Sequence, residues 1–336
     1  MRFLLLTSLL MTTTLAGQTW NMQVSGTTAS LRGVAAVTDS VVWASGTGGT
    51  WLLTTDGGSS WHSGAVPGAE KLDFRGVCAL DARHAWLMAA GEGEKSRIYQ
   101  TTDGGEHWTL LFTNPDPKGF FDGLAFRDAN RGILLGDAVD GRMTVFTTAD
   151  GGRNWTRQRT PDAVGEEGAF AASNSSLALG PKGTVWFATG GKGAARVFRS
   201  SDEGLSWISV GTPLRRDGPS AGIFSLAFSD SRNGIAVGGD YAKDKEAEGN
   251  LALTADGGLS WKVPAGSRPA GFRSAVAYLA ERRIWVATGT SGSDLSIDGG
   301  KNWKQFDGGS WNALAVAAGK TMWAVGEKGK IAKLSF

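Results

Sequence analysis

The chain has 336 residues, 41% of them hydrophobic and 20% charged, with 34 Lys and Arg against 32 Asp and Glu. This is the composition of a folded protein, because there is enough apolar side chain to offset the entropy lost on ordering the chain. The formal net charge of +2 is not the large excess of positive charge that nucleic acid binding requires, so we expect no nucleic acid partner. The 50 glycines and 14 tryptophans indicate short strands joined by tight turns, which favours an all-β protein.

Residues 1–16 have the pattern of an export signal. Met1 and Arg2 supply a positive start, residues 3–15 are mostly apolar, and residues 14–16 resemble a small-residue cleavage site. The apolar stretch is too short to cross a bilayer as a helix, and no later segment is longer, so we expect no transmembrane segment in the mature chain. The sequence therefore predicts a signal peptide over 1–16 and a periplasmic or secreted mature protein. An uncleaved anchor is the alternative.

A short motif recurs six times, at spacings of 42 to 54 residues. Each copy has Ser or Thr, then Asp two positions later, a glycine pair (Glu-Gly in the fourth copy), and Trp five positions after the Asp. Repeats of this period are typical of repeat architectures. The Asp and Trp residues of the six copies are Asp56 and Trp61, Asp103 and Trp108, Asp150 and Trp155, Asp202 and Trp207, Asp256 and Trp261, and Asp298 and Trp303.

The chemistry of the motif is that of a hairpin turn, which we call an Asp turn. The carboxylate is suited to accept hydrogen bonds from backbone N–H groups just beyond it, and glycine supplies the positive φ of a tight turn. The Trp begins the returning strand, and its indole is expected to cover the turn. Each turn offers one carboxylate, whereas calcium takes about six to eight oxygens, so we interpret these residues as structural and not as a metal site.

The motif resembles the Asp-box, also called the bacterial neuraminidase repeat, and this resemblance implies a β-propeller. The residues agree, because two β-like runs, such as 31–37 and 41–45, precede the strand that enters each turn, and a further strand follows the Trp. Four short antiparallel strands per unit is the plan of a propeller blade.

Seven blades are predicted, although there are six Asp turns. After the last turn, residues 312–316, 321–325 and 330–334 form three strands of another unit, and residues 19–24 match its missing strand, with Trp20 in the place of Trp61. Closure of the last blade by the N-terminal strand removes two exposed sheet edges. We therefore expect a single seven-bladed β-propeller over 17–336, and a monomer.

The channel mouth opposite the Asp turns is the expected binding face, since loops on a rigid scaffold commonly carry function. Arginine there is suited to capture a carboxylate or a phosphate. The alternative, weighed equally, is a solvated rim. Charged loops at 91–97, 213–217 and 241–248 are further candidates. Counting back from the second-strand Trp places at the mouth Arg32, Arg75, Asp122, Ser175, Phe224, Ser274 with Arg273 beside it, and Asn312, and the loop 213–217 adds Arg215 and Arg216.

Residues 31–61 and 74–108 carry a resemblance to one particular family of Asp-box propellers. In them the chain is similar to the exported photosystem II stability/assembly factor family, whose members are seven-bladed. The resemblance implies an arginine-bearing face that holds a membrane-protein partner during assembly, a role that extends to Arg32, Arg75 and Arg273. The chain departs from the family pattern at its other mouth positions. The expected function is an exported, non-enzymatic scaffold that binds a protein partner, such as a membrane-protein assembly intermediate.

The rival class is a glycoside hydrolase of the sialidase type, which shares the Asp-box. That resemblance implies a Tyr nucleophile with a Glu partner, and Tyr278 near Glu281 is the one candidate pair, although it lies along a strand. We therefore assign no catalytic residue. The single cysteine, Cys78, excludes an intrachain disulfide, and the three histidines are scattered. The sequence thus predicts neither a metal nor a cofactor.

Overall fold

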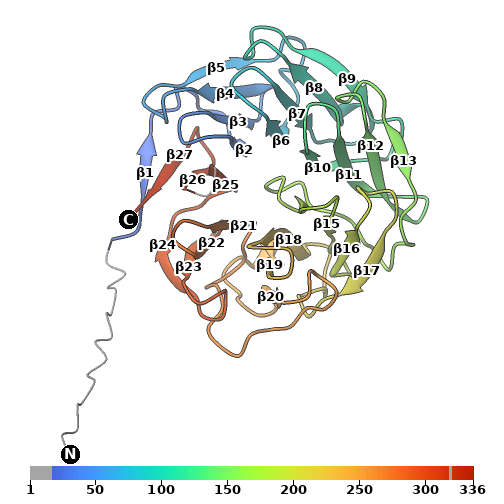
Figure 1. Cartoon of the computed structure of the whole chain (residues 1–336), viewed down its shortest axis with the longest axis vertical. Coiled ribbons are helices and arrows are strands. Elements are labelled where there is room, and N and C mark those ends of the chain that lie inside the picture. The colour runs from blue at the N-terminus through green and yellow to red at the C-terminus, as the bar shows by residue number, and fades with distance from the viewer. Residues whose placement is uncertain (1–16, 318–319) are drawn as a thin grey trace, which may run out of the picture.

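Seven antiparallel sheets form a ring around a central axis (Figure 1). The structure, a computed structural model, describes residues 17–317 and 320–336. The predicted signal peptide, 1–16, lies outside the described residues. Each sheet is one blade, with its first strand nearest the axis and its last at the rim. The prediction of a seven-bladed β-propeller is confirmed.

The blades follow one another along the chain, and we number them from 1 to 7. Blade 1 is β2 (Leu31–Ala36), β3 (Val42–Gly46), β4 (Thr50–Thr54) and β5 (His62–Ala65), and blade 2 is β6 (Phe74–Ala79), β7 (Ala85–Ala89), β8 (Arg97–Thr101) and β9 (Thr109–Thr113). Blade 3 is β10 (Phe121–Phe126), β11 (Gly132–Val139), β12 (Arg142–Thr148) and β13 (Thr156–Gln158), and blade 4 is β14 (Leu177–Leu179), β15 (Val185–Ala188), β16 (Arg196–Ser200) and β17 (Ile208–Gly211).

The remaining blades complete the ring, together with two single-turn 3₁₀ helices in the mouth-side loops. Blade 5 is β18 (Ala221–Phe228), β19 (Gly234–Asp240) and β20 (Leu251–Thr254), and blade 6 is β21 (Ala275–Leu279), β22 (Ile284–Gly289), β23 (Gly292–Ser296) and β24 (Lys304–Asp307). Blade 7 is β25 (Ala313–Ala317), β26 (Thr321–Val325), β27 (Ile331–Ser335) and β1 (Thr19–Gln23), and the 3₁₀ helices are η1 (Gly93–Lys95) and η2 (Tyr241–Lys243).

The hydrophobic core lies between the blades. Each of the seven described clusters joins two neighbouring sheets: one, for example, packs Trp43 and Trp51 of blade 1 against Phe74 and Leu87 of blade 2. Middle strands such as β3 and β7 are buried along their whole length because both of their faces meet a neighbour. Burial of this apolar surface around the whole ring stabilises the wheel as one unit.

Hydrogen bonds around each aspartate hold the Asp turns. Asp56 Oδ2 accepts from Ser60 Oγ at 2.6 Å, and its Oδ1 accepts from the Ser60 N–H at 2.9 Å and from Thr54 Oγ1 at 2.8 Å. These bonds favour the ionised carboxylate and lower its pKa to about 2. The same two Oδ1 bonds recur in the other five turns, at Asp103, Asp150, Asp202, Asp256 and Asp298.

Tryptophan side chains connect each blade to the next. The turn residue Trp108 of blade 2 meets Trp43 of blade 1 edge-on, with ring centroids 6.1 Å apart, and Trp61 of blade 1 meets Trp323 of blade 7 at 5.8 Å. The second turn glycine is required by this packing: a Cβ on Gly58 would lie 2.6 Å from the Trp323 indole, and its φ is +91°. Of the turn tryptophans, Trp207, Trp261 and Trp303 are buried and the others half-buried.

Blade 5 has three strands where its neighbours have four. The segment after its Asp turn pairs only at Lys262, through a single bridge to Leu253. Two residues later stands Pro264, at the position that Gly64 occupies in blade 1 and pairs with Trp51. Proline has no N–H to donate to the neighbouring strand, so the fourth strand ends after one bridge.

The N-terminal strand closes the ring, as predicted. Residues Thr19–Gln23 pair antiparallel with β27, with Trp20 opposite Leu334. Trp20 also reaches blade 6, where its Nε1 donates to Ser293 Oγ at 3.1 Å and its ring lies 5.3 Å from that of Trp311. The strand therefore joins the first and last parts of the chain and covers the edge of β27.

Candidate functional site

A cavity of about 440 Å³ opens at one end of the channel, where the inner strands begin. We call it the mouth cavity. Because β2 starts at this end and β4 ends at the other, the Asp turns lie on the opposite face of the wheel. The predicted residues Arg32, Arg75, Asp122 and Asn312 all line the cavity, and so do Phe224 and Ser274.

The arginine sector of the cavity comes from blades 1 and 2. Arg75 Nε donates to Asp73 Oδ2 at 2.7 Å, so its charge is compensated. Arg32 forms no ion pair among the described residues, and its Nε is buried without a hydrogen-bond partner. Burial, and next the neighbouring Arg75, lower the pKa of Arg32, which nevertheless stays protonated because guanidinium is so basic.

Blade 3 supplies an acidic sector. The Asp122 side chain is buried, and its Oδ2 has no partner. Asp137, at an irregularity between β11 and β12, accepts a hydrogen bond from the Ala169 N–H at 2.9 Å. Burial, followed by the nearby Asp137, raises the pKa of Asp122 well above its usual range, and burial also raises that of Asp137. Asp137, a lone acid after the apolar run 132–136, was not predicted to lie at the mouth.

Aromatic side chains from blades 4 to 6 form the opposite wall. Phe170 stacks on Phe224, with ring centroids 3.8 Å apart, and Phe272 meets Phe224 edge-on at 4.7 Å. Tyr241, which is 54% exposed, borders this group at the cavity entrance. Phe170 fits here because Gly190 and Gly222 lie against its ring. A Cβ at Gly190 would come within 2.4 Å of the ring.

The segment 168–176, which leads into blade 4, forms the floor of the channel. Ser173 Oγ donates to the Ser274 carbonyl of blade 6 at 2.7 Å, and Asn174 exchanges hydrogen bonds with the Leu124 backbone of blade 3. Ser175, expected at the mouth, instead bonds to Ser225 Oγ at 2.7 Å and does not line the cavity. Residues 169–172 take its place there, because the segment turns inward across the channel.

Arg273, expected beside the other mouth arginines, is completely buried. Its Nε donates to Asp294 Oδ2 at 2.6 Å, and its Nη1 donates to the Phe272 carbonyl at 2.7 Å. Burial lowers the pKa of Arg273 and raises that of Asp294, and their attraction opposes both changes. The expectation that Arg273 contacts a partner is therefore wrong, because its side chain lies inside blade 6.

Arg215 and Arg216 line a separate depression of about 510 Å³. Arg215 is held by Asp217, at 2.7 Å, and by Glu246, and hydrogen bonds to these two acids raise its pKa. The structure therefore does not bring the loop 213–217 into the mouth cavity.

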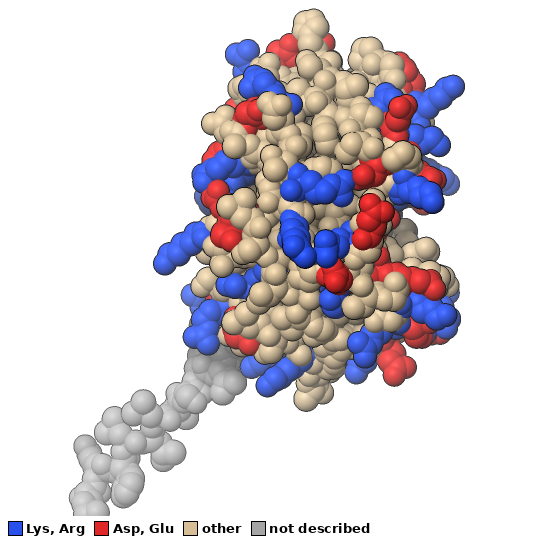
Figure 2. Space-filling model, turned by 90° about the vertical axis from the view of Figure 1, so that its right-hand side faces the viewer, with Lys and Arg blue, Asp and Glu red and all other residues tan. Residues whose placement is uncertain are grey.

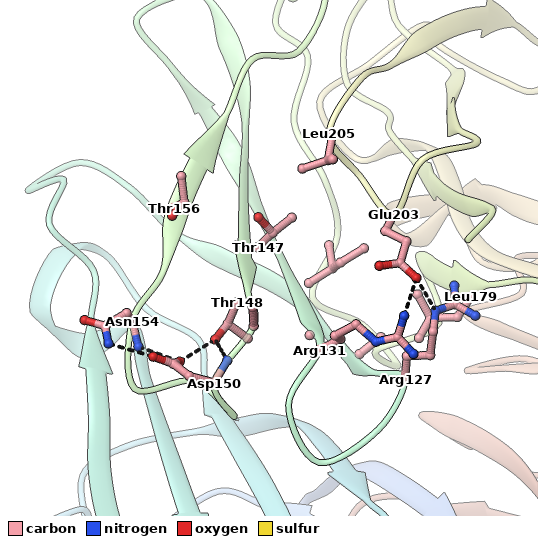
Figure 3. A pocket seen from close by; sticks show the side chains of 14 residues that line it. Arg127, Arg131, Thr147, Thr148, Asp150, Asn154, Thr156, Leu179, Glu203 and Leu205 are labelled. Atoms are coloured by element: carbon pink, nitrogen blue, oxygen red, sulfur yellow. Dashed lines mark hydrogen bonds and ion pairs between the residues drawn. The ribbon is translucent and has the colours of Figure 1, made fainter. Parts of the chain in front are cut away.

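A further pocket, of about 340 Å³, lies on the Asp-turn face between blades 3 and 4 (Figure 3). Arg131 Nη1 donates to Glu203 Oε1 at 2.7 Å, and Asp150 is engaged by Thr148 and Asn154. The charged groups in this pocket thus have partners. On the outer side of the ring seen in Figure 2, basic and acidic side chains are interspersed.

Tyr278 packs against Trp285, with ring centroids 4.8 Å apart and ring planes tilted by 42°, in a pocket that it shares with Asp256 and Asp298 on the Asp-turn face. The pair suggested by the sialidase alternative is thus remote from the mouth. Residues 17–317 and 320–336 contain no group of three His, Cys, Asp or Glu side chains arranged for a metal. No described helix is long and apolar enough to cross a membrane.

No known protein family and no curated protein matches the sequence. Solved structures match it over nearly its whole length. A structure of YCF48 bound to a D1 peptide has a TM-score of 0.69 at 17% identity and covers 94% of this chain and 97% of that one. YCF48 from Cyanidioschyzon merolae gives 0.67 at 18% identity, with coverages of 94% and 98%. U3-55K gives 0.64 at 15%, with the same coverages. The likeness is one of fold.

Proposed function

We propose that this protein is an exported, non-enzymatic scaffold that holds a protein partner on its mouth face. The observation that carries the proposal is Arg32, a cation without an ion pair among the described residues, in an open cavity whose opposite wall is aromatic. Cations and aromatic rings on a rigid frame are the groups that anchor protein partners. The wheel of seven blades supplies that frame.

Two likenesses support a protein as the partner. The sequence resembles photosystem II stability/assembly factors, and the fold resembles a YCF48 structure that contains a D1 peptide. By analogy, the proposed partner is an assembly intermediate of a membrane protein, and the scaffold acts as a monomer. An acidic group on the partner would complete the hydrogen bonding of Arg32.

The proposed export has a direct test. If residues 1–16 are removed during secretion, the protein isolated from its native organism begins at Gly17 and is found in the periplasm or the medium. N-terminal sequencing after cell fractionation measures both. A full-length chain in the membrane fraction would instead support the uncleaved anchor.

The docking face is tested by affinity capture from the native organism. We compare the wild type with Arg32→Glu/Arg75→Glu at the mouth and with Arg153→Glu/Arg232→Glu, which makes the same charge change at exposed arginines on the Asp-turn face. The proposal expects one partner to be captured by the wild type and the control but not by the mouth variant, with all three melting alike. Undiminished capture by the mouth variant would show that the partner docks elsewhere.

A further inference from the structure

Two residues that line the mouth cavity each have a buried polar atom that lacks a partner, and the two atoms differ in chemical kind. Arg32 Nε is a donor on blade 1, and Asp122 Oδ2 is a carboxyl oxygen on blade 3. Buried polar atoms in native proteins are nearly always hydrogen-bonded, so an unpaired one needs an explanation. Two such residues on the wall of one cavity point to a ligand that carries both an acceptor and a donor.

The neighbouring charges do not satisfy either atom. Arg75, on blade 2 between the blades of Arg32 and Asp122, is bonded to Asp73. Asp137, next to Asp122, is bonded to the Ala169 N–H. Gly168 allows this approach, because a Cβ there would lie 2.6 Å from Asp137 Oδ1. Arg75 and Asp137 are thus engaged. Glu327 also lines the cavity and attracts Arg32, but within the described chain Arg32 and Asp122 take part in no ion pair.

The rest of the cavity suits an apolar group of moderate size. The stacked pair Phe170 and Phe224, with Phe272 against it, offers an aromatic surface on the side away from Arg32. A volume of about 440 Å³ is in the range of small-molecule sites, which are mostly apolar with a few convergent polar groups. Aromatic rings pack well against such surfaces in offset or edge-on arrangements.

We propose that the mouth cavity binds a free α-amino acid with an aromatic or large aliphatic side chain. Its carboxylate would lie on Arg32, its ammonium group on Asp122, and its side chain against Phe170 and Phe224. A simple acid or a simple amine would satisfy one of the two unpaired atoms, whereas an amino acid satisfies both. This site goes beyond the proposed scaffold function, because it requires no protein partner.

Binding is linked to a proton. The charged groups that face Asp122 are Asp137 on β11 and Arg75 on β6. Burial and Asp137 raise the pKa of Asp122, and the ammonium group of the ligand would lower it again. The ammonium group therefore favours the ionised carboxylate, and any proton released on binding makes the observed heat depend on the ionisation enthalpy of the buffer.

The test is calorimetric titration of the purified mature protein with L-phenylalanine. N-acetyl-L-phenylalanine lacks the ammonium group, L-phenylalanine amide lacks the carboxylate, and glycine lacks the side chain. We expect each of the three to bind at least about tenfold more weakly, since each loses a charge-assisted contact or the apolar one. Titrations in phosphate and in Tris should differ in heat by the proton released.

Two variants assign the contacts. Asp122→Asn should weaken the binding of L-phenylalanine at least about tenfold and leave that of the N-acetyl compound unchanged, while Arg32→Gln should do the same for the amide. Asp140→Asn, an exposed residue of the same blade that does not line the cavity, is the matched control. The ligand series on the wild type needs no variant to fold.

The proposal is overturned if L-phenylalanine does not bind at millimolar concentration, or if the N-acetyl compound binds equally well. Either result concerns the small-molecule site alone. Capture of a protein partner is measured separately, so the failure of one proposal is distinguishable from the failure of the other.

Discussion

Glu203 Oε1 accepts a hydrogen bond from Arg131 Nη1 at 2.7 Å, across the boundary between blades 4 and 3 (Figure 3). Glu203 occupies the first glycine position of its Asp turn, with φ at +63°. Arg131 is also bonded to Asp128, so it links a loop of blade 3 to the turn of blade 4. At this turn a residue other than glycine adopts the left-handed conformation, and its side chain forms a contact between blades.

Two substitutions at Glu203 separate the effect of its left-handed conformation on stability from the effect of its ionic interactions. Glu203→Ala removes the ion pairs with Arg131 and Arg127 and keeps a side chain at positive φ, whereas Glu203→Gly removes the ion pairs and the side chain. We expect the glycine variant to be more stable than the alanine variant by about 1 kcal/mol, since a left-handed residue other than glycine is disfavoured by about that much. Urea denaturation measures the difference. At Glu106, where φ is not positive, alanine should be at least as stable as glycine.

Asp150 supports its turn through three hydrogen bonds, from Thr148 and from the backbone and side chain of Asn154. Asp150→Ala removes all three, and we expect the Tm to fall by about 1 to 3 °C. Capture of the partner should be unchanged, because this turn lies on the face opposite the mouth. Glu106→Ala, which changes an exposed turn residue, serves as the control. Lost capture with an unchanged Tm would contradict a structural role for the turn.

Acid should weaken the fold through the Asp turns. The pKa of Asp56, Asp103, Asp150, Asp202 and Asp256 is about 2 in the fold, against about 3.9 in an unfolded chain. A carboxyl whose pKa is lowered by folding contributes stability above its unfolded pKa and loses it as the pH falls through the folded value. The Tm should therefore decline between about pH 5 and pH 2. In Asp150→Ala the decline in Tm should be smaller. An equal decline would argue against a stabilising role for the hydrogen bonds of the Asp150 carboxylate.

Arg273 and Asp294 form a buried ion pair, which is sensitive to the loss of one partner. Arg273→Met leaves Asp294 as a buried, unpaired acid, and we expect a loss of about 3 to 5 kcal/mol in the free energy of unfolding. Asp294→Leu added to that variant should restore much of the loss, because neither charge then remains. Denaturant titration measures both. A mild effect of the single variant would show that water reaches the pair.

Much of the fold is local in origin and is readable from the sequence. Asp, Gly and Trp at constant offsets specify a turn through hydrogen bonds within five residues, as at Asp56 and Ser60. Repetition of the unit then predicts a ring, since each blade buries its apolar faces only against its neighbours. Closure by residues 19–23 was predictable for the same reason, because the last unit lacked one strand and Trp20 matched it.

Where the repeat continues, prediction of the mouth residues depends on the exact register along each inner strand. Arg273 was misplaced by one position: it corresponds to Leu31 and Phe74, which point into the core, whereas its neighbour Ser274 corresponds to Arg32. Successive side chains of a strand point to opposite faces, so one residue of register decides between burial and exposure.

The local pattern along the chain thus determined the blades, their number and the turns that hold them, because hydrogen bonds and strand alternation act between residues close in sequence. Tertiary structure alone decided which residues join the repeat positions Arg32, Arg75 and Asp122 at the mouth. Phe170 and Asp137 come together with Arg32 because an unrepeated segment, 168–176, crosses the channel and bonds to blades 3, 5 and 6. Such contacts join residues up to 101 positions apart, and no periodic signal along the chain encodes them.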